Sequence, residues 1–187
     1  MIKYMNLIGV RARKACENKI STKVKNKVLN DYAKLISKEK RFIINQNLKD
    51  INFAKKKGLK ESLIKRLHLN EKKLNGIVKS ILKIAKLKDP IDNILEKWKR
   101  PNGLNISRVS IPIGVIGVIY ESRPNVTSDV ASLCFKSGNV VILKGGSEAL
   151  NSNRALAKLF RKALKKNKVD ENFIQFIDSK QRKLVDI

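Results

Sequence analysis

The chain has 187 residues, which allows one domain of roughly 100 to 200 residues or slightly more. Hydrophobic residues make up 42% of it and charged residues 31%, a balance that indicates a globular protein and excludes a disordered or membrane-spanning class. The apolar run at residues 5–10 ends at Arg11 and is too short for a signal peptide or a membrane span, so we expect a cytoplasmic protein without a membrane partner. Cys16 and Cys134 lie far apart without metal-ligand spacing, which predicts neither a disulfide framework nor a metal site.

The formal net charge of +26 raises the question of a nucleic-acid partner, because basic proteins attract polyanions. The lysines are spread over nearly every segment and are not interleaved with aromatic residues in one patch, and no nucleic-acid-binding motif accompanies them. We therefore expect no nucleic-acid partner. A non-catalytic interaction module, or a basic nucleic-acid-binding module, stays open as the alternative to an enzyme.

Residues 1–95 are expected to form an N-terminal helical region that packs on the domain after it. Apolar side chains recur there at helical spacing, as in Val28 and Tyr32. The strongest apolar stripe consists of Leu74, Ile77, Val78, Ile81, Leu82 and Ala85. Asn70 is a candidate N-cap for that helix, and Pro90 ends it because the residue before a proline avoids helical geometry.

The hydrophobic period changes at residues 96–112, where we expect a β-hairpin arm. The segment Pro101-Asn102-Gly103 provides the turn chemistry that joins two extended segments, residues 97–100 and 104–111. Apolar and polar residues are mixed in the second segment, so at least part of one face should meet water or another subunit. We expect a homo-oligomer that forms through this arm.

From residue 113 onward the pattern of strands and helices alternates, which is typical of an α/β fold with a parallel sheet. The nearly all-apolar run at residues 115–120 predicts a strand that is covered on both faces. The elements expected after it are a helix at 127–136, a strand at 140–143, a helix at 148–166, a strand at 173–177 and the start of a helix at 181–187. Three strands leave a hydrophobic edge that proteins usually cover, so we expect the sheet to be incomplete.

Two long segments resemble a known family. Residues 113–127, with the sequence IGVIGVIYESRPNVT, and residues 137–149, with the sequence SGNVVILKGGSEA, are similar to segments of γ-glutamyl phosphate reductases in the same order. The hairpin also resembles this family, and the whole resemblance covers residues 98–178. It implies that residues 113–187 are part of the NADPH-binding, Rossmann-variant domain of the aldehyde dehydrogenase superfamily. The catalytic domain with its nucleophilic cysteine is then expected farther along, outside this chain.

The resemblance implies that Lys144, Ser147 and Glu148 contact the nucleotide of NADPH, with Gly145 and Gly146 between them. The physical setting agrees, because Lys144 follows a strand of the parallel sheet, where open α/β sheets bind ligands. The glycines would let the backbone approach a ligand closely, and Ser147 would open a helix whose N-terminus favours anions. Without the family, the same three polar residues read as a solvated lysine, an N-cap serine and a first-turn glutamate.

Other polar residues carry separate expectations. By the resemblance, the side-chain amide of Asn125 donates to the oxyanion of the reaction, and its plainer interpretation is a turn or N-cap asparagine. Arg123 is a candidate for binding the substrate phosphate and is otherwise a surface arginine. His68, the only histidine, has no identifiable partner and is expected to be structural. Neither cysteine matches the family's nucleophile by position or surrounding motif.

The function that the resemblance implies is NADPH-dependent reduction of γ-glutamyl phosphate to glutamate-5-semialdehyde, with release of phosphate, in proline biosynthesis. The expected partners are γ-glutamyl phosphate, further copies of the chain and glutamate 5-kinase. The chain alone is expected to be inactive, since it lacks the nucleophile. Another aldehyde dehydrogenase relative with a different acyl substrate is a weaker alternative, because the string ESRPN at residues 121–125 is closer to the glutamyl phosphate enzymes.

Overall fold

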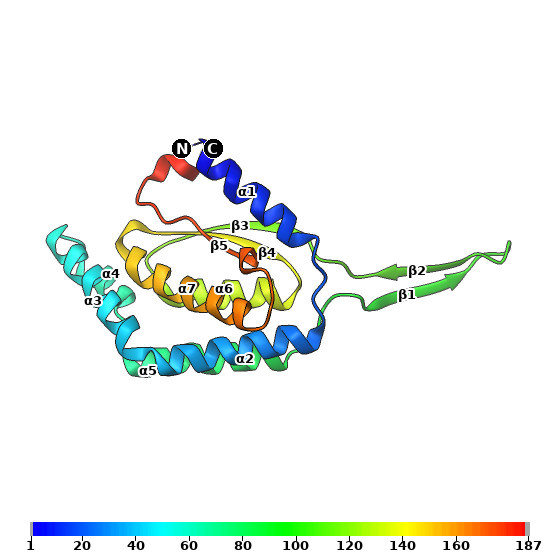
Figure 1. The fold of residues 1–187 in the computed structure, drawn as a ribbon, viewed down its shortest axis with the longest axis horizontal. Helices are drawn as coiled ribbons and strands as arrows, with labels where there is room; N and C mark the ends of the chain where they lie inside the picture. Colours follow the sequence, from blue (N-terminus) through cyan, green and yellow to red (C-terminus); the bar gives the residue numbers. More distant parts are fainter. Residues whose placement is uncertain (1, 186–187) are drawn as a thin grey trace.

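The computed structural model of the chain describes residues 2–185, and a parallel sheet lies at the centre of its α/β part. The sheet has three strands in the order β3-β4-β5, namely β3 (Val115–Tyr120), β4 (Val140–Gly145) and β5 (Ile174–Phe176). Two helices, α6 (Pro124–Lys136) and α7 (Leu150–Lys166), cover one face, and α1 (Ile2–Cys16) lies along the other (Figure 1). The predicted α/β class and parallel pairing are confirmed.

Four further helices of the N-terminal region pack outside the sheet domain. They are α2 (Thr22–Lys38), α3 (Lys40–Lys56), α4 (Glu61–Leu67) and α5 (Glu71–Lys86). Helices α2 and α5 lie side by side and cover α6 and α7 from below in Figure 1. The predicted N-cap is confirmed, because the Asn70 side chain accepts a hydrogen bond of 2.9 Å from the Lys73 backbone N–H.

Aromatic rings fill the space between the N-terminal helices and the sheet domain. Tyr32 on α2 is fully buried, and its ring centroid lies 4.3 Å from that of Phe160 on α7. Phe135 packs edge to face with Phe160 and with Phe173, each at 5.7 Å. The Tyr32 hydroxyl is satisfied by a 2.7 Å hydrogen bond to Ser128 on α6. These contacts join segments from both halves of the chain into one core.

The expected hairpin arm is present, and it projects to the right in Figure 1 away from the rest of the fold. Strands β1 (Ile94–Lys99) and β2 (Asn105–Val109) pair antiparallel, and nearly all of their residues are exposed. Gly103 takes a φ of 88° in the turn, a conformation that glycine adopts without steric cost. Exposure extends to both faces of the arm, beyond the part of one face that the sequence predicts.

The structure corrects three details of the sequence-based elements. Strand β3 was expected to be covered on both faces, yet the Ile119 side chain is 66% exposed, because β3 is an edge strand and β4 the central one. Helix α6 begins three residues earlier than expected, since Pro124 suits the first turn of a helix. Residues 182–185 form a short 3-10 turn, η3, where the start of a longer helix was expected, and residues 186–187 lie outside the described part.

Within residues 2–185, no helix combines the length and apolar character that crossing a membrane requires.

Candidate functional site

The residues singled out by the sequence lie at the carboxyl end of the central strand. Lys144 and Gly145 are the last residues of β4, and the chain continues through a single 3-10 turn, η1 (Ser147–Ala149), into α7. We call residues 144–149 the β4–α7 loop. Because Tyr120 at the end of β3 pairs with Gly145, the connection from β3 to α6 opens at the same edge of the sheet, at the left in Figure 1.

Glu148 links these two connections. One of its carboxylate oxygens accepts a hydrogen bond from the Ser122 hydroxyl, and the other accepts one of 3.0 Å from Ser147. Burial alone would raise the pKa of Glu148, but the hydrogen bonds from Ser122, its own backbone and Ser147, together with the charge of Lys57, outweigh it and lower the pKa. Glu148 is therefore an ionised acceptor at neutral pH.

Lys144 places a cation beside that carboxylate. Its side chain is only 7% exposed, and its Nζ donates to the backbone oxygen of Gly145 at 3.1 Å. Burial lowers the pKa of Lys144, and the charge of Glu148 opposes the change. An ammonium has three N–H donors, so Lys144 retains donors beyond the one to Gly145.

The two glycines of the loop differ in how closely other side chains approach them. A Cβ at Gly145 would collide with the Asn153 amide and approach the Tyr120 ring to 3.0 Å, and a Cβ at Gly146 would come within 2.5 Å of a Glu148 oxygen. The sequence analysis attributed the glycines to close approach of a ligand. The Asn153 amide and the Tyr120 ring occupy the space that a Cβ would need at Gly145, which accounts for this glycine, whereas the atoms near Gly146 belong to the flexible end of Glu148.

The amino end of α7 is already occupied by a carboxylate. Asp50 on α3 accepts hydrogen bonds from the backbone N–H groups of Asn151 at 3.1 Å and Ser152 at 2.7 Å. It also accepts from the side chains of the same two residues at 2.8 and 2.6 Å. This differs from the expectation that the helix N-terminus would serve a bound anion, because an internal anion takes these donors. Asp50 was missed because about a hundred residues separate it from α7.

A buried chain of hydrogen bonds between hydroxyl and amide groups connects the elements around the β4–α7 loop. The Tyr120 hydroxyl bonds to Thr127 at 2.7 Å, and the Thr127 hydroxyl donates to the Asn153 side-chain oxygen at 3.0 Å. Burial raises the pKa of Tyr120 to about 12. The chain joins β3, α6 and α7, so the three elements that border the loop are fixed to one another.

Within residues 2–185, Asn125 and Arg123 form no side-chain hydrogen bond or ion pair with the β4–α7 loop. Asn125 donates to Asp129 at 3.1 Å and borders a cavity of about 320 Å³ between α5 and α6, whose lining residues do not include Lys144. Arg123 precedes α6, is exposed, and makes no ion pair within residues 2–185. The structure brings the loop residues and Ser122 together but does not bring Asn125 to them. The catalytic role of Asn125 and the phosphate role of Arg123 stay predictions.

The remaining candidates have structural surroundings. His68 caps the end of α4, and its backbone oxygen accepts from the Lys73 Nζ at 2.6 Å. Cys134 is buried on α6, and burial raises the pKa of its thiol, which disfavours the reactive thiolate. Across the described part of the chain, no group of three or more His, Cys, Asp or Glu side chains could hold a metal ion.

Comparison with known proteins places this fold and sequence. No family model matches the chain. γ-Glutamyl phosphate reductase of Persephonella marina is 46% identical over 167 residues, which make up 89% of this chain and 38% of that protein. The enzyme of the same name from Aliarcobacter butzleri is 51% identical over 158 residues, 84% of this chain and 38% of that protein. The chain thus spans about two fifths of the length of these curated relatives.

Solved structures agree with the sequence relatives. A propionaldehyde dehydrogenase from Clostridium phytofermentans matches 97% of the chain with a TM-score of 0.67 at 13% identity, which shows that the fold is of the aldehyde dehydrogenase type. The γ-glutamyl phosphate reductase of Thermotoga maritima matches 97% of the chain and 44% of its own length, with a TM-score of 0.94 and 39% identity. By sequence and fold, the chain belongs to the γ-glutamyl phosphate reductase family and corresponds to its N-terminal part.

Proposed function

We propose that the chain forms the NADPH-binding part of a cytoplasmic γ-glutamyl phosphate reductase. The whole enzyme would reduce γ-glutamyl phosphate to glutamate-5-semialdehyde with release of phosphate, in proline biosynthesis. The observation that carries the proposal is the β4–α7 loop, which holds a buried lysine and an ionised glutamate at the carboxyl end of the central strand. The sequence relatives named for this activity support it.

The loop residues have complementary roles in this proposal. Lys144 donates hydrogen bonds to ribose hydroxyls of the nucleotide, and Glu148 accepts from them. Ser122 and Ser147 hold the Glu148 carboxylate in its ionised form and fixed orientation. NADPH, when bound, supplies the hydride for the reduction. The donor set of one ammonium, one carboxylate and two hydroxyls suits a ribose, whose hydroxyls both donate and accept.

Asn125 and Arg123 complete the proposed set on the side of the substrate. The Asn125 amide, which donates to Asp129 here, would donate to the carbonyl oxygen of the substrate as negative charge develops. Arg123, exposed at the start of α6, would bind the phosphate of the acyl phosphate.

The test is nucleotide binding by the 187-residue chain. NADPH titrated into the chain in a calorimeter should bind saturably, and Lys144→Ala should weaken binding about tenfold, since a charge-assisted hydrogen bond is worth roughly 1.5 to 3 kcal/mol. Lys162→Ala, which removes an exposed lysine of α7, is the matched control and should bind normally. Absence of nucleotide binding together with steeply salt-dependent DNA affinity would support the basic binding module instead.

A second measurement concerns turnover. The isolated chain should not sustain NADPH oxidation with γ-glutamyl phosphate, because Cys134 is buried with a raised pKa and Cys16 is half-buried beside Gly114. Continuous NADPH consumption by the pure chain would contradict this part of the proposal.

The hairpin arm is the proposed contact between subunits. It exposes large apolar side chains, with Trp98 at 40%, Leu104 at 57% and Val109 at 41% exposure. Burying these apolar side chains against a second copy of the chain is more favourable than leaving them exposed to water. Sedimentation of the chain should show an oligomer that Trp98→Ala and Leu104→Ser together weaken, and a monomer at all concentrations would refute the contact.

A further inference from the structure

Two lysines beside the β4–α7 loop have no role in the function proposed above. Lys57 ends helix α3, and its Nζ lies 5.0 Å from the centroid of the Phe53 ring. Lys180 follows strand β5, and its Nζ lies 3.8 Å from the same centroid. Both lysines are exposed, and they come from segments far apart in the sequence. One aromatic ring therefore gathers two cations at one place on the surface.

Helix α3, which carries Phe53, packs against the β4–α7 loop. Ala149 of the loop packs in one small hydrophobic cluster with Ile51 and Ala54 of α3. Asp50, on the same helix, binds the first turn of α7. These contacts set the end of α3, and with it Lys57, against the residues that we propose to bind the nucleotide.

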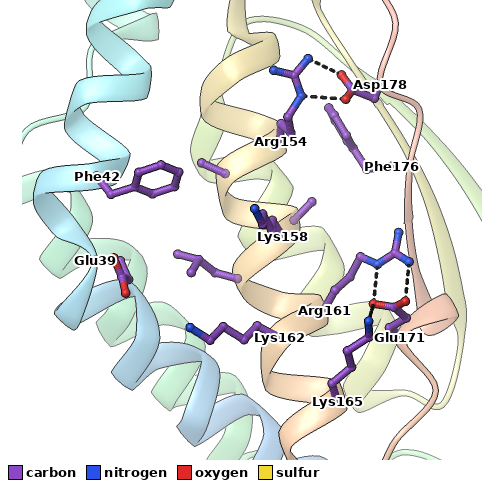
Figure 2. Close-up of a pocket in the computed structure, with 13 residues that line it drawn as sticks. Glu39, Phe42, Arg154, Lys158, Arg161, Lys162, Lys165, Glu171, Phe176 and Asp178 are labelled. Carbon is purple, nitrogen blue, oxygen red and sulfur yellow. Dashed lines mark hydrogen bonds and ion pairs between the residues drawn. The ribbon is translucent and has the colours of Figure 1, made fainter.

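The segment after β5 is held at the same edge of the sheet. Arg154 in the first turns of α7 donates to both oxygens of Asp178, at 2.6 and 2.7 Å (Figure 2). Asp178 is two residues before Lys180. The bidentate pair thus anchors the backbone from which Lys180 reaches the Phe53 ring.

The negative charge of Glu148 suggests a role for the ammonium groups of Lys57 and Lys180. Glu148 is ionised, and an ionised carboxylate at a ribose site repels a phosphate on that ribose. The positive charge of Lys57 is one of the causes that lower the pKa of Glu148, so Lys57 acts electrostatically on this carboxylate.

We propose that Lys57 and Lys180, stacked on Phe53, bind a phosphate on the 2′ position of the adenosine ribose. This rests on the proposed function and adds the groups that select a 2′-phosphorylated dinucleotide over an unphosphorylated one. The 2′-phosphate carries roughly 1.5 to 2 negative charges, which the Glu148 carboxylate repels and which these two ammonium groups would offset. Neither lysine stands out in the sequence, because lysine is abundant in nearly every segment.

The experiment compares two probes, 2′,5′-ADP and 5′-AMP, which differ in the 2′-phosphate. Both are titrated into the wild-type chain and into the double variant Lys57→Ala, Lys180→Ala. Loss of two charged contacts should weaken 2′,5′-ADP binding at least about tenfold and change 5′-AMP binding by less than about twofold. The matched control is Lys55→Ala, Lys56→Ala, which removes the same charge from exposed positions of the same helix and should leave the ratio of the two affinities unchanged.

Each outcome of these titrations either supports or overturns the proposed 2′-phosphate site. A wild-type chain that binds neither probe overturns both this inference and the proposed function. Equal weakening of both probes in the double variant, or the same loss in the Lys55, Lys56 control, overturns the inference alone, since the nucleotide site then works without these two groups. The Lys57→Arg, Lys180→Arg variant keeps both charges and should retain the preference for 2′,5′-ADP, which guards against a folding defect as the cause.

Discussion

The two ends of this molecule are held in different ways. At the carboxyl end of the sheet, side chains from remote segments fix the β4–α7 loop, as Asp50 on α3 does for the start of α7. At the other end, the hairpin arm depends on its own backbone pairing, and its strands stand in solvent (Figure 1). A binding site needs side chains held in place, whereas an arm that meets a partner needs only a firm attachment. Mutations at the two ends should therefore have very different effects on stability.

The attachment of the arm is the one part of that end with tight polar contacts. Asp89 binds the Lys25 ammonium at 3.0 Å and accepts from Thr22 at 2.8 Å. Ser110, just past β2, donates to the Pro90 backbone oxygen at 2.7 Å. The arm thus joins α2 and α5 through its base, and its tip contributes little to the fold.

The largest effect is expected for Asp50→Ala. It removes the acceptor for four hydrogen bonds at the start of α7, and we expect a loss of about 3 kcal/mol in the free energy of unfolding. Urea unfolding followed by circular dichroism measures it. Asp50→Asn keeps one acceptor oxygen and should lie between the wild type and Asp50→Ala. Glu61→Ala, at an exposed position, is the control, and an equal cost for both alanine variants would contradict the role of Asp50 in holding the start of α7.

Asp89→Asn should have the next largest effect and should change how stability depends on pH. Burial would raise the pKa of Asp89, but hydrogen bonds from Lys25, Thr22 and Ile91 lower it below that of an ordinary aspartate. The stabilisation is therefore complete above a pH of about 3.9 and is lost as the pH falls through the lower folded-state pKa. At neutral pH the variant leaves the buried Lys25 ammonium without its counter-charge, at a cost of about 2 kcal/mol.

The pH profile separates this carboxylate from the others. As the pH is lowered from about 7 to about 2, the free energy of unfolding should fall less steeply in Asp89→Asn than in the wild type. Parallel profiles for the two proteins would show that Asp89 does not contribute to the acid sensitivity.

Thr127→Val tests the buried chain under the β4–α7 loop. Valine has nearly the same shape, so the change removes hydrogen bonds and leaves the Tyr120 hydroxyl and the Asn153 oxygen without this partner. The expected loss is about 1 to 2 kcal/mol. Thermal unfolding should show a lowered midpoint that Thr127→Ser restores. A serine variant as unstable as the valine variant would attribute the effect to packing instead.

The smallest effect is expected in the arm. Trp98→Ala on β1 removes a large side chain that is already 40% exposed and remote from the core, so we expect a change below about 0.5 kcal/mol in a dilute, monomeric sample. Urea unfolding at several protein concentrations distinguishes this from an effect on association. A loss of 2 kcal/mol or more at high dilution, roughly the cost of truncating a core residue, would mean that the arm is part of the core.

The sequence predicted those features that depend on local pattern. The apolar stripe of α5, the Asn70 cap and the hairpin turn at Gly103 all follow from neighbouring residues, and the structure confirms them except for Leu82 of the stripe, which is exposed. The exposure of Ile119 was not predicted, because an edge strand and a central strand can share the same apolar pattern. The apolar pattern of a segment indicates its secondary structure but not which elements pack against it.

In the candidate site, too, local features were predictable from the sequence and long-range contacts were not. Its position after β4 was predictable, since a strand, two glycines and a helix are visible in sequence. The partners of the loop were not: Ser122 was part of a recognised motif without an assigned role, and Asp50 reaches α7 only through the packing of α3. Lys57 is one of many lysines, so only the fold distinguishes it. Long-range contacts of this kind leave no local signal.

The helix α1 has a consequence for how the protein is made. Ile8 on α1 is buried against Ile177 and Leu184, so α1 packs on residues that come much later in the sequence. During synthesis α1 leaves the ribosome long before Ile177 and Leu184 are added to the chain. Its apolar face therefore stays exposed to water until β5 has joined the sheet. Contacts between such distant positions slow folding, because the chain must close a long loop before they form. We expect the docking of α1 to be the last step of folding and the first contact to open under denaturing stress.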